Sequence, residues 1–129
     1  MNDLTLIESA AREAGEIAKG HFKTNPQIWD KANNAGPVTQ ADLDVDLMLR
    51  DQLLAARPTY GWLSEETEDT IDRLSTDIVF IVDPIDGTRA FIEGAPHWAH
   101  SLAIVKNGKV QSAVVFLPIL DLMFTASLN

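Results

Sequence analysis

The strongest constraint on the fold is an apolar run that leads directly into two aspartates. Residues 77–83, Asp-Ile-Val-Phe-Ile-Val-Asp, are rich in β-branched side chains and predict a buried strand. In the next residues, Pro84-Ile-Asp-Gly-Thr88, the proline favours an extended conformation of Asp83 and the glycine permits a turn or a close approach to a ligand. Residues 89–93 can open a short helix. The chain therefore passes from strand to helix with two carboxylates, Asp83 and Asp86, at the transition.

Carboxylates beside the backbone amides of a turn suit two ligands at once. Carboxylate oxygens bind hard cations such as Mg²⁺, and amides at the start of a helix favour an anion such as phosphate. The simpler interpretation is an Asp-Pro turn followed by an aspartate that caps a helix, and both are common. For the whole string from Asp83 to Thr88 after a hydrophobic strand, a combined metal and phosphate site is the better interpretation.

Three segments of the chain together are similar to the motifs of a known family. Asp83-Pro-Ile-Asp-Gly-Thr88 resembles the Asp-Pro-x-Asp-Gly-Thr signature of the inositol monophosphatase-like phosphatases, which are magnesium-dependent and lithium-sensitive. Gly61-Trp-Leu-Ser-Glu-Glu66 and Pro37-Val-Thr-Gln-Ala-Asp42 resemble two further motifs, in the family's order. The resemblance covers essentially the whole chain of 129 residues. Family members have a second half, in which a Trp-Asp motif supplies another metal-binding carboxylate.

The resemblance implies which residues hold the metal. Glu65, Asp83 and the backbone carbonyl of Ile85 would bind a first Mg²⁺, with Mn²⁺ as an acceptable substitute. Asp83 would bridge to a second ion, which Asp86 would also bind. Glu66 would contribute charge around the site rather than a direct ligand. This assignment uses oxygen ligands alone, as Mg²⁺ and Mn²⁺ prefer.

The resemblance also implies the catalytic roles and the reaction. Thr88, polarised by Asp42, would orient the attacking water next to the ion that Glu65 holds, and the amides of Gly87 and Thr88 would receive the phosphate. The function expected is Mg²⁺-dependent hydrolysis of a small phosphomonoester such as inositol monophosphate. The alternatives are 3′(2′),5′-bisphosphate nucleotidase activity, histidinol-phosphatase activity, and a truncated, non-catalytic module that binds metal or phosphate.

Composition narrows the class of partner. Ten basic and 19 acidic residues give a formal charge of −9, which argues against a nucleic acid or an anionic membrane as partner. Because cysteine is absent, disulfides and zinc–thiolate sites are excluded. No apolar run approaches the roughly 18 residues of a membrane span. We therefore expect a cytoplasmic protein, and the resemblance implies that its partner is a small phosphorylated metabolite.

Hydrophobic periodicity predicts an α+β fold. Apolar residues at helical spacing predict a helix across residues 3–23, capped by Asp3, and a second helix that follows Thr39 as its cap and ends before Arg57. Strands are predicted at 60–64, 77–83, 98–105, 109–117 and 122–127, with Asn107-Gly108 as a hairpin turn. Two long helices would pack on a largely antiparallel sheet. By resemblance, residues 1–129 form the N-terminal metal- and phosphate-site domain of the layered αβαβα sugar-phosphatase fold, without its C-terminal domain.

Several residues receive only structural interpretations. Asp44 and Asp46 are expected to be solvated, His21 to interact with the C-terminal dipole of the first helix, and His97 and His100 to be structural. The strands at 101–105 and 113–117 are almost continuously apolar, which is typical of a sheet buried on both faces. Because two helices cover one face, we expect the chain to form a homodimer or to depend on the family's C-terminal half.

Overall fold

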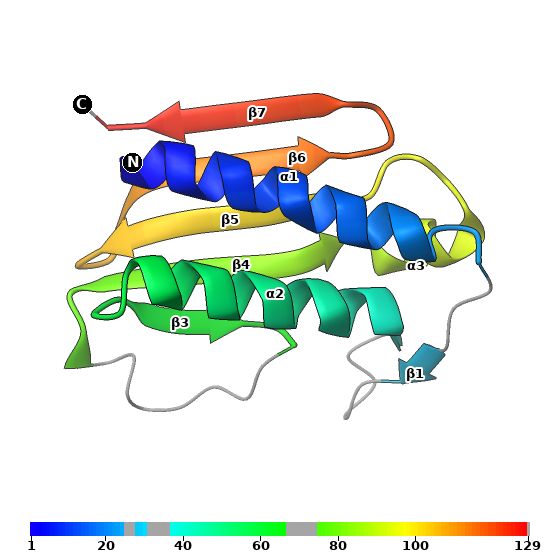
Figure 1. Ribbon diagram of the computed structural model, residues 1–129, viewed down its shortest axis with the longest axis horizontal. Coiled ribbons are helices and arrows are strands. Elements are labelled where there is room, and N and C mark those ends of the chain that lie inside the picture. Colours follow the sequence, from blue (N-terminus) through cyan, green and yellow to red (C-terminus); the bar gives the residue numbers. More distant parts are fainter. Residues whose placement is uncertain (25–27, 31–36, 67–74, 129) are drawn as a thin grey trace.

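Two long helices lie side by side over one face of a five-stranded sheet (Figure 1). The computed structural model describes residues 1–24, 28–30, 37–66 and 75–128. The helices are α1 (Asp3–His21) and α2 (Gln40–Ala56). The predicted fold class, helices packed on a mostly antiparallel sheet, is confirmed.

The sheet has the order β3-β4-β5-β6-β7. Its strands are β3 (Gly61–Ser64), β4 (Ile78–Asp86), β5 (Ala99–Lys106), β6 (Lys109–Leu117) and β7 (Leu122–Ser127). β3 runs parallel to β4, and the other neighbours are antiparallel, so the predicted meander is confirmed. At the β5–β6 turn both Asn107 and Gly108 have positive φ, at 50° and 79°, as a two-residue hairpin of this type requires.

Three short elements complete the described fold. β1 (Ile28–Asp30) pairs with β2 (Pro37–Thr39) as a separate two-stranded ribbon, and β2 leads directly into α2. The helix α3 (Thr88–Glu93) follows β4. The strand predicted to end at Asp83 instead runs to Asp86, so the carboxylate motif lies within β4 rather than after it.

The ends of the two long helices test the caps that the sequence predicted. Thr39 caps α2, as predicted, and it also forms a reciprocal capping box with Asp42. The predicted cap of α1 was wrong by one residue, because Asn2 accepts the hydrogen bond from the Thr5 amide. Asp3 is the first helical residue and instead binds Arg57 and the Tyr60 hydroxyl at 2.9 and 2.8 Å. The predicted α1 was also two residues too long.

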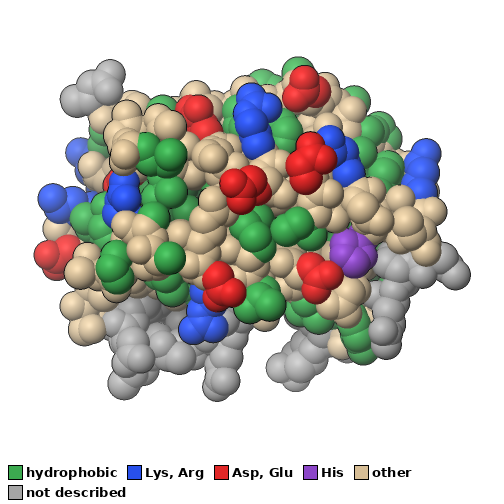
Figure 2. Space-filling model, in the orientation of Figure 1, with side chains coloured by type: hydrophobic (Ala, Val, Ile, Leu, Met, Phe, Trp, Pro, Cys, Tyr) green, Lys and Arg blue, Asp and Glu red, His purple; other side chains and the backbone are tan. Residues whose placement is uncertain are grey.

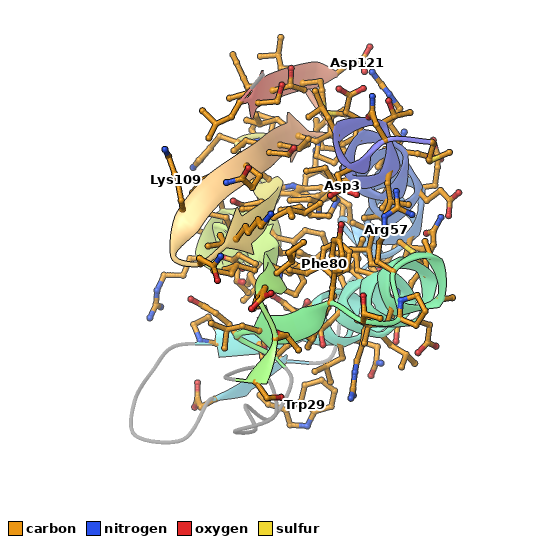
Figure 3. The ribbon with its side chains drawn as sticks, turned by 90° about the vertical axis from the view of Figure 1, so that its left-hand side faces the viewer. Asp3, Trp29, Arg57, Phe80, Lys109 and Asp121 are labelled. Carbon is orange, nitrogen blue, oxygen red and sulfur yellow. The ribbon has the colours of Figure 1, made fainter. Side chains whose placement is uncertain are left out.

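The core lies between the helices and the near face of the sheet. Figure 3 shows Phe80 pointing from β4 into this layer, with the helices on one side of the sheet. Gly15 allows α1 to approach closely, since a Cβ there would lie 2.9 Å from the Phe116 ring. The three central strands of the sheet, β4, β5 and β6, each contribute two buried residues to this core: Phe80, Val82, Leu102, Ile104, Val114 and Phe116.

The opposite face of the sheet carries exposed apolar side chains. Ile81, Val115 and Phe124 retain 40%, 36% and 57% exposure. Within the described residues, therefore, the nearly continuous apolar strands are covered on the helical side alone. On the helical side, charged side chains of both signs are scattered among apolar ones (Figure 2). Neither of the long helices has the length and hydrophobicity needed to cross a lipid bilayer, and the same holds for α3.

Candidate metal and phosphate site

Two of the predicted metal ligands lie on the neighbouring strands β3 and β4, near the point where β3 ends. The two strands are parallel and Ser64 lies opposite Val82, so Glu65, the first residue after β3, comes level with Asp83 within β4. Glu65 is exposed and Asp83 is half-buried. The parallel pair β3–β4 thus brings together residues that are 18 positions apart in the chain.

A β-bulge sets the relation between Asp83 and Asp86. Asp83 pairs with Ser101 and Asp86 with Ala99, so two residues of β4, Pro84 and Ile85, face a single residue of β5. A spacing of three would put the aspartates on opposite faces of a regular strand. Because their partners are two residues apart, the extra residue in the bulge returns both carboxylates to the same face.

His100 is the residue opposite this bulge. Its side chain is fully buried, and Nδ1 is hydrogen-bonded to the carbonyl oxygen of Pro84. Burial lowers the pKa of His100 to about 4, although the Pro84 carbonyl opposes that shift, so the ring is neutral near pH 7. The expectation of a structural histidine is confirmed for His100. His97 is exposed.

A buried carboxylate joins the start of α2 to the start of α3. Asp42 is completely buried, and its Oδ2 accepts hydrogen bonds from the Thr39 amide and hydroxyl at 2.8 and 2.7 Å. Its Oδ1 lies 3.0 Å from the Thr88 hydroxyl, which confirms the predicted Asp42–Thr88 hydrogen bond. The same hydroxyl lies 3.2 Å from the Ile85 carbonyl. The capping box fixes the Asp42 carboxylate, and that carboxylate in turn orients Thr88.

Gly87 makes the turn from β4 into α3. Its φ of 93° is in the left-handed region, which only glycine adopts without strain. A Cβ at Gly87 would also lie 3.4 Å from the Trp98 Cα. The motif therefore needs glycine for its backbone conformation and for its close approach to the residues before β5.

The solvated roles expected for Asp44 and Asp46 were wrong. Asp46 is buried and accepts a short hydrogen bond from the Ser64 hydroxyl, whose oxygen accepts one from the Glu66 amide at 3.2 Å. This contact ties α2 to the turn that carries Glu65 and Glu66. The spacing in the sequence was an indication that Asp46 is buried, because Asp46 lies four residues after Asp42 and so lies on the same face of the helix.

Asp44 is half-buried and links the two long helices. Its Oδ2 lies 2.9 Å from His21 Nε2, and its Oδ1 accepts from Gln40 Nε2 at 2.7 Å. His21 does lie in the last turn of α1, as predicted, but it also makes this contact with α2. Sequence alone gave no signal for a contact between helices 23 positions apart.

The donor chemistry fits a hard cation, although the described residues do not form a closed cluster. Glu65, Asp83, Asp86 and the Ile85 carbonyl supply oxygen alone, as Mg²⁺ and Mn²⁺ prefer. Within the described ranges, no three side chains of histidine, cysteine or acidic type are gathered closely enough to hold an ion. The register thus gives two pairs, Glu65 with Asp83 where β3 ends beside β4, and Asp83 with Asp86 across the bulge.

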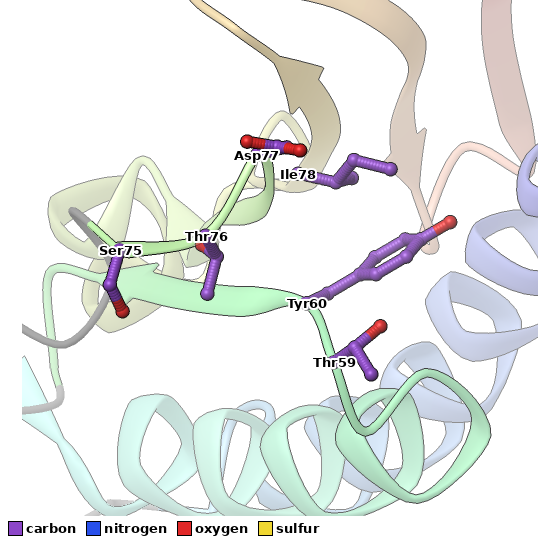
Figure 4. A pocket seen from close by; sticks show the side chains of 6 residues that line it. All are labelled: Thr59, Tyr60, Ser75, Thr76, Asp77 and Ile78. Atoms are coloured by element: carbon purple, nitrogen blue, oxygen red, sulfur yellow. The ribbon is translucent and has the colours of Figure 1, made fainter.

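A separate hollow lies at the opposite end of β3 and β4. Figure 4 shows it between the residues that precede the two strands and the first residue of β4. Its lining is Thr59, Tyr60, Ser75, Thr76, Asp77 and Ile78. Since none of these is a predicted site residue, the hollow is not part of the metal and phosphate site.

The chain belongs to the inositol monophosphatase family, whose model matches residues 2–129. It is 41% identical over 119 residues to the inositol-1-monophosphatase of Rhizobium meliloti. The matched segment covers 92% of this chain and 42% of that protein. An inositol monophosphatase of Thermotoga maritima has a TM-score of 0.90 at 29% identity, covering 98% of this chain and 48% of the other. The suhB protein of Bartonella henselae has a TM-score of 0.86 at 36% identity, and the match covers 95% of this chain and 48% of the other.

The matches agree in extent as well as in fold. This chain spans about half the length of the relatives it matches. Family membership therefore covers the three motifs and the fold around them.

Proposed function

We propose that residues 1–129 form the N-terminal metal- and phosphate-site domain of a Mg²⁺-dependent phosphomonoesterase that acts on a small metabolite such as inositol monophosphate. The observation that carries the proposal is the hydrogen bond between buried Asp42 and Thr88, next to the bulged strand with its two aspartates. Membership of a phosphatase family supports the reaction class. A cytoplasmic location and a small-molecule substrate remain predictions from the sequence.

The proposed metal ligands are Glu65, Asp83, Asp86 and the Ile85 carbonyl, with Glu66 adding charge nearby. Bound Mg²⁺ or Mn²⁺ would neutralise the phosphoryl oxygens and lower the pKa of water. The bulge serves this role by turning Asp83 and Asp86 to one face. An exposed Glu65 and Asp86 can adjust their rotamers to an ion, whereas half-buried Asp83 supplies the fixed position between them.

Thr88 orients the attacking water in this proposal. When its hydroxyl hydrogen points to Asp42 Oδ1, the lone pairs of Oγ1 are available to accept a hydrogen bond from water. Asp42 cannot swing away, because Thr39 holds its other oxygen with two hydrogen bonds. Glu65 would hold the ion beside that water, and the amides of Gly87 and Thr88 would donate to the phosphate oxygens.

The test is a chimera in which this chain replaces the segment it matches in the Rhizobium meliloti relative. We expect phosphate release from inositol monophosphate at saturating Mg²⁺. Thr88→Val removes the hydroxyl at nearly constant volume and should lower kcat by about a hundredfold or more. The control is Glu93→Gln, which removes an exposed acid from α3 and should leave kcat unchanged.

The same assay separates the alternatives. Faster release from 3′-phosphoadenosine 5′-phosphate or histidinol phosphate would assign the other substrate classes. A folded chimera that binds Mg²⁺ in calorimetry but releases no phosphate from any of these esters would instead support the non-catalytic module. We expect the isolated chain to be at least about a hundredfold slower than the chimera, because the resemblance places another carboxylate ligand outside it.

A further inference from the structure

We propose that His100 is a positioning residue that holds the Asp83–Asp86 segment in its bulged conformation through the Pro84 carbonyl. The consequence for metal binding rests on the proposed function, since it takes Asp83 and Asp86 as ligands. The contact itself stands on the geometry of β4 and β5. His100 lies opposite the two residues of the bulge, Pro84 and Ile85, and its Nδ1 is hydrogen-bonded to the carbonyl oxygen of Pro84.

The contact defines the tautomer of the ring. A carbonyl oxygen can only accept a hydrogen bond, so His100 must carry its hydrogen on Nδ1. The other nitrogen, Nε2, then presents a lone pair. It is buried and has no hydrogen-bond partner among the described residues. His100 is therefore a neutral donor directed at one backbone oxygen.

The unpartnered Nε2 argues that packing alone does not explain a histidine here. An apolar side chain of similar volume would fill the space without burying an unsatisfied nitrogen, which is unfavourable. The feature that such a side chain could not reproduce is the donation to Pro84. Proline has no amide hydrogen, and a bulge interrupts the regular ladder, so an added donor stabilises this particular backbone path.

The surroundings keep the imidazole in place. The Trp98 ring meets it edge-on with centroids 5.7 Å apart, and the Phe116 ring lies 6.5 Å away on the other strand. Trp98 also packs its backbone against Gly87 at the far end of the motif. The start of β5 thus contacts the carboxylate motif at two points, at Pro84 through His100 and at Gly87 through Trp98.

The experiment compares His100→Asn with His100→Leu in the 129-residue chain. The Asn amide nitrogen occupies nearly the position of His Nδ1 and can donate to Pro84, whereas Leu fills the space without a donor. Nuclear magnetic resonance reports the amide shifts of Asp86, Gly87 and Thr88, and calorimetry with Mn²⁺ reports affinity. We expect His100→Leu to shift these amides and to weaken Mn²⁺ binding about tenfold or more, while His100→Asn stays within about threefold of wild type.

Two controls make the outcomes distinct. His97→Leu changes an exposed histidine nearby and should alter neither readout. If wild type binds no Mn²⁺, the proposed function fails, and the amide shifts alone decide the positioning role. Equal amide shifts and affinities in wild type and His100→Leu would overturn the inference. If His100→Leu does not fold, the ¹⁵N shifts of the wild-type ring decide, because a hydrogen on Nε2 rather than Nδ1 would overturn it.

Discussion

The two faces of the sheet differ in how their apolar side chains are covered. Phe80 and Ile81 are neighbours in β4, yet Phe80 is completely buried under the helices and Ile81 is 40% exposed on the other side. On that outer face Val115 and Phe124 are cross-strand partners on β6 and β7, and both are exposed. The sequence makes both faces apolar, whereas the two helices account for one. From this difference we infer that the apolar composition of the strands suits a sheet with a second layer packed on its outer face.

The largest expected effect is a contrast between adjacent core and surface positions. Phe80→Ala removes a ring that packs against Tyr60 and Trp62, at centroid distances of 5.2 and 6.4 Å. We expect it to lower the free energy of unfolding by about 3–5 kcal/mol. Ile81→Ala removes a side chain that is already partly in water and should cost less than about 1 kcal/mol. Urea titration at pH 7 measures both.

Comparable losses in the two variants would mean that the outer face is already covered in solution. That result would break the comparison between the faces. A change in the urea m-value would identify a partly unfolded or self-associated reference state instead. Repeating the titration at several protein concentrations separates these cases.

A smaller effect concerns pH and the inner face. Burial holds the pKa of His100 at about 4, below its usual 6.5. Below pH 6.5 His100 is protonated in the unfolded chain, whereas in the folded chain it stays neutral down to about pH 4. The free energy of unfolding therefore falls as the pH falls from 6.5 to about 4. The loss is at most about 3 kcal/mol. His100→Leu should flatten the profile between these limits, and exposed His97→Leu should not.

The pH measurement has a clear contrary result. If His100→Leu and wild type lose stability in parallel from pH 6.5 to 4, the ring is accessible to protons and the inner face is wetter than its burial indicates. Differences between variants are used because protonation of carboxylates contributes to both profiles.

Local chemistry was predictable from the sequence, and tertiary contacts were predictable only through the family. The Thr39–Asp42 capping box and the Asn107-Gly108 hairpin are set by residues close in the chain. The Asp42–Thr88 contact joins positions 46 apart and came from the resemblance. The spacing of four residues puts Asp46 on the same helix face as Asp42, but nothing in the sequence marked Ser64 as its partner, and Asp46 was wrongly expected to be solvated.

The bulge was missed for a different physical reason. Proline after Asp83 indicates the end of a strand, since it removes a ladder donor. In the structure the ladder continues to Asp86, because two residues share one partner position and a buried histidine meets the Pro84 carbonyl. That solution depends on β5, which begins 13 residues after the motif's second aspartate. Sequence patterns within β4 could not reveal it.

The smallest expected effect, and the most direct test of the outer face, is weak self-association. Val115 and Phe124 are partners on the adjacent strands β6 and β7, and Ile81 lies on the same face of the sheet, on β4. Exposed apolar area on a sheet favours pairing between copies. We expect light scattering to give a mass above that of the monomer at roughly tens of micromolar. Phe124→Lys should restore the monomer, because a charge there opposes burial. The matched control is Leu47→Lys, at a 60% exposed apolar residue of α2, which should change nothing. A monomeric wild type, or equal effects of the two lysines, would show that the outer face does not drive association and would remove the distinction between the faces.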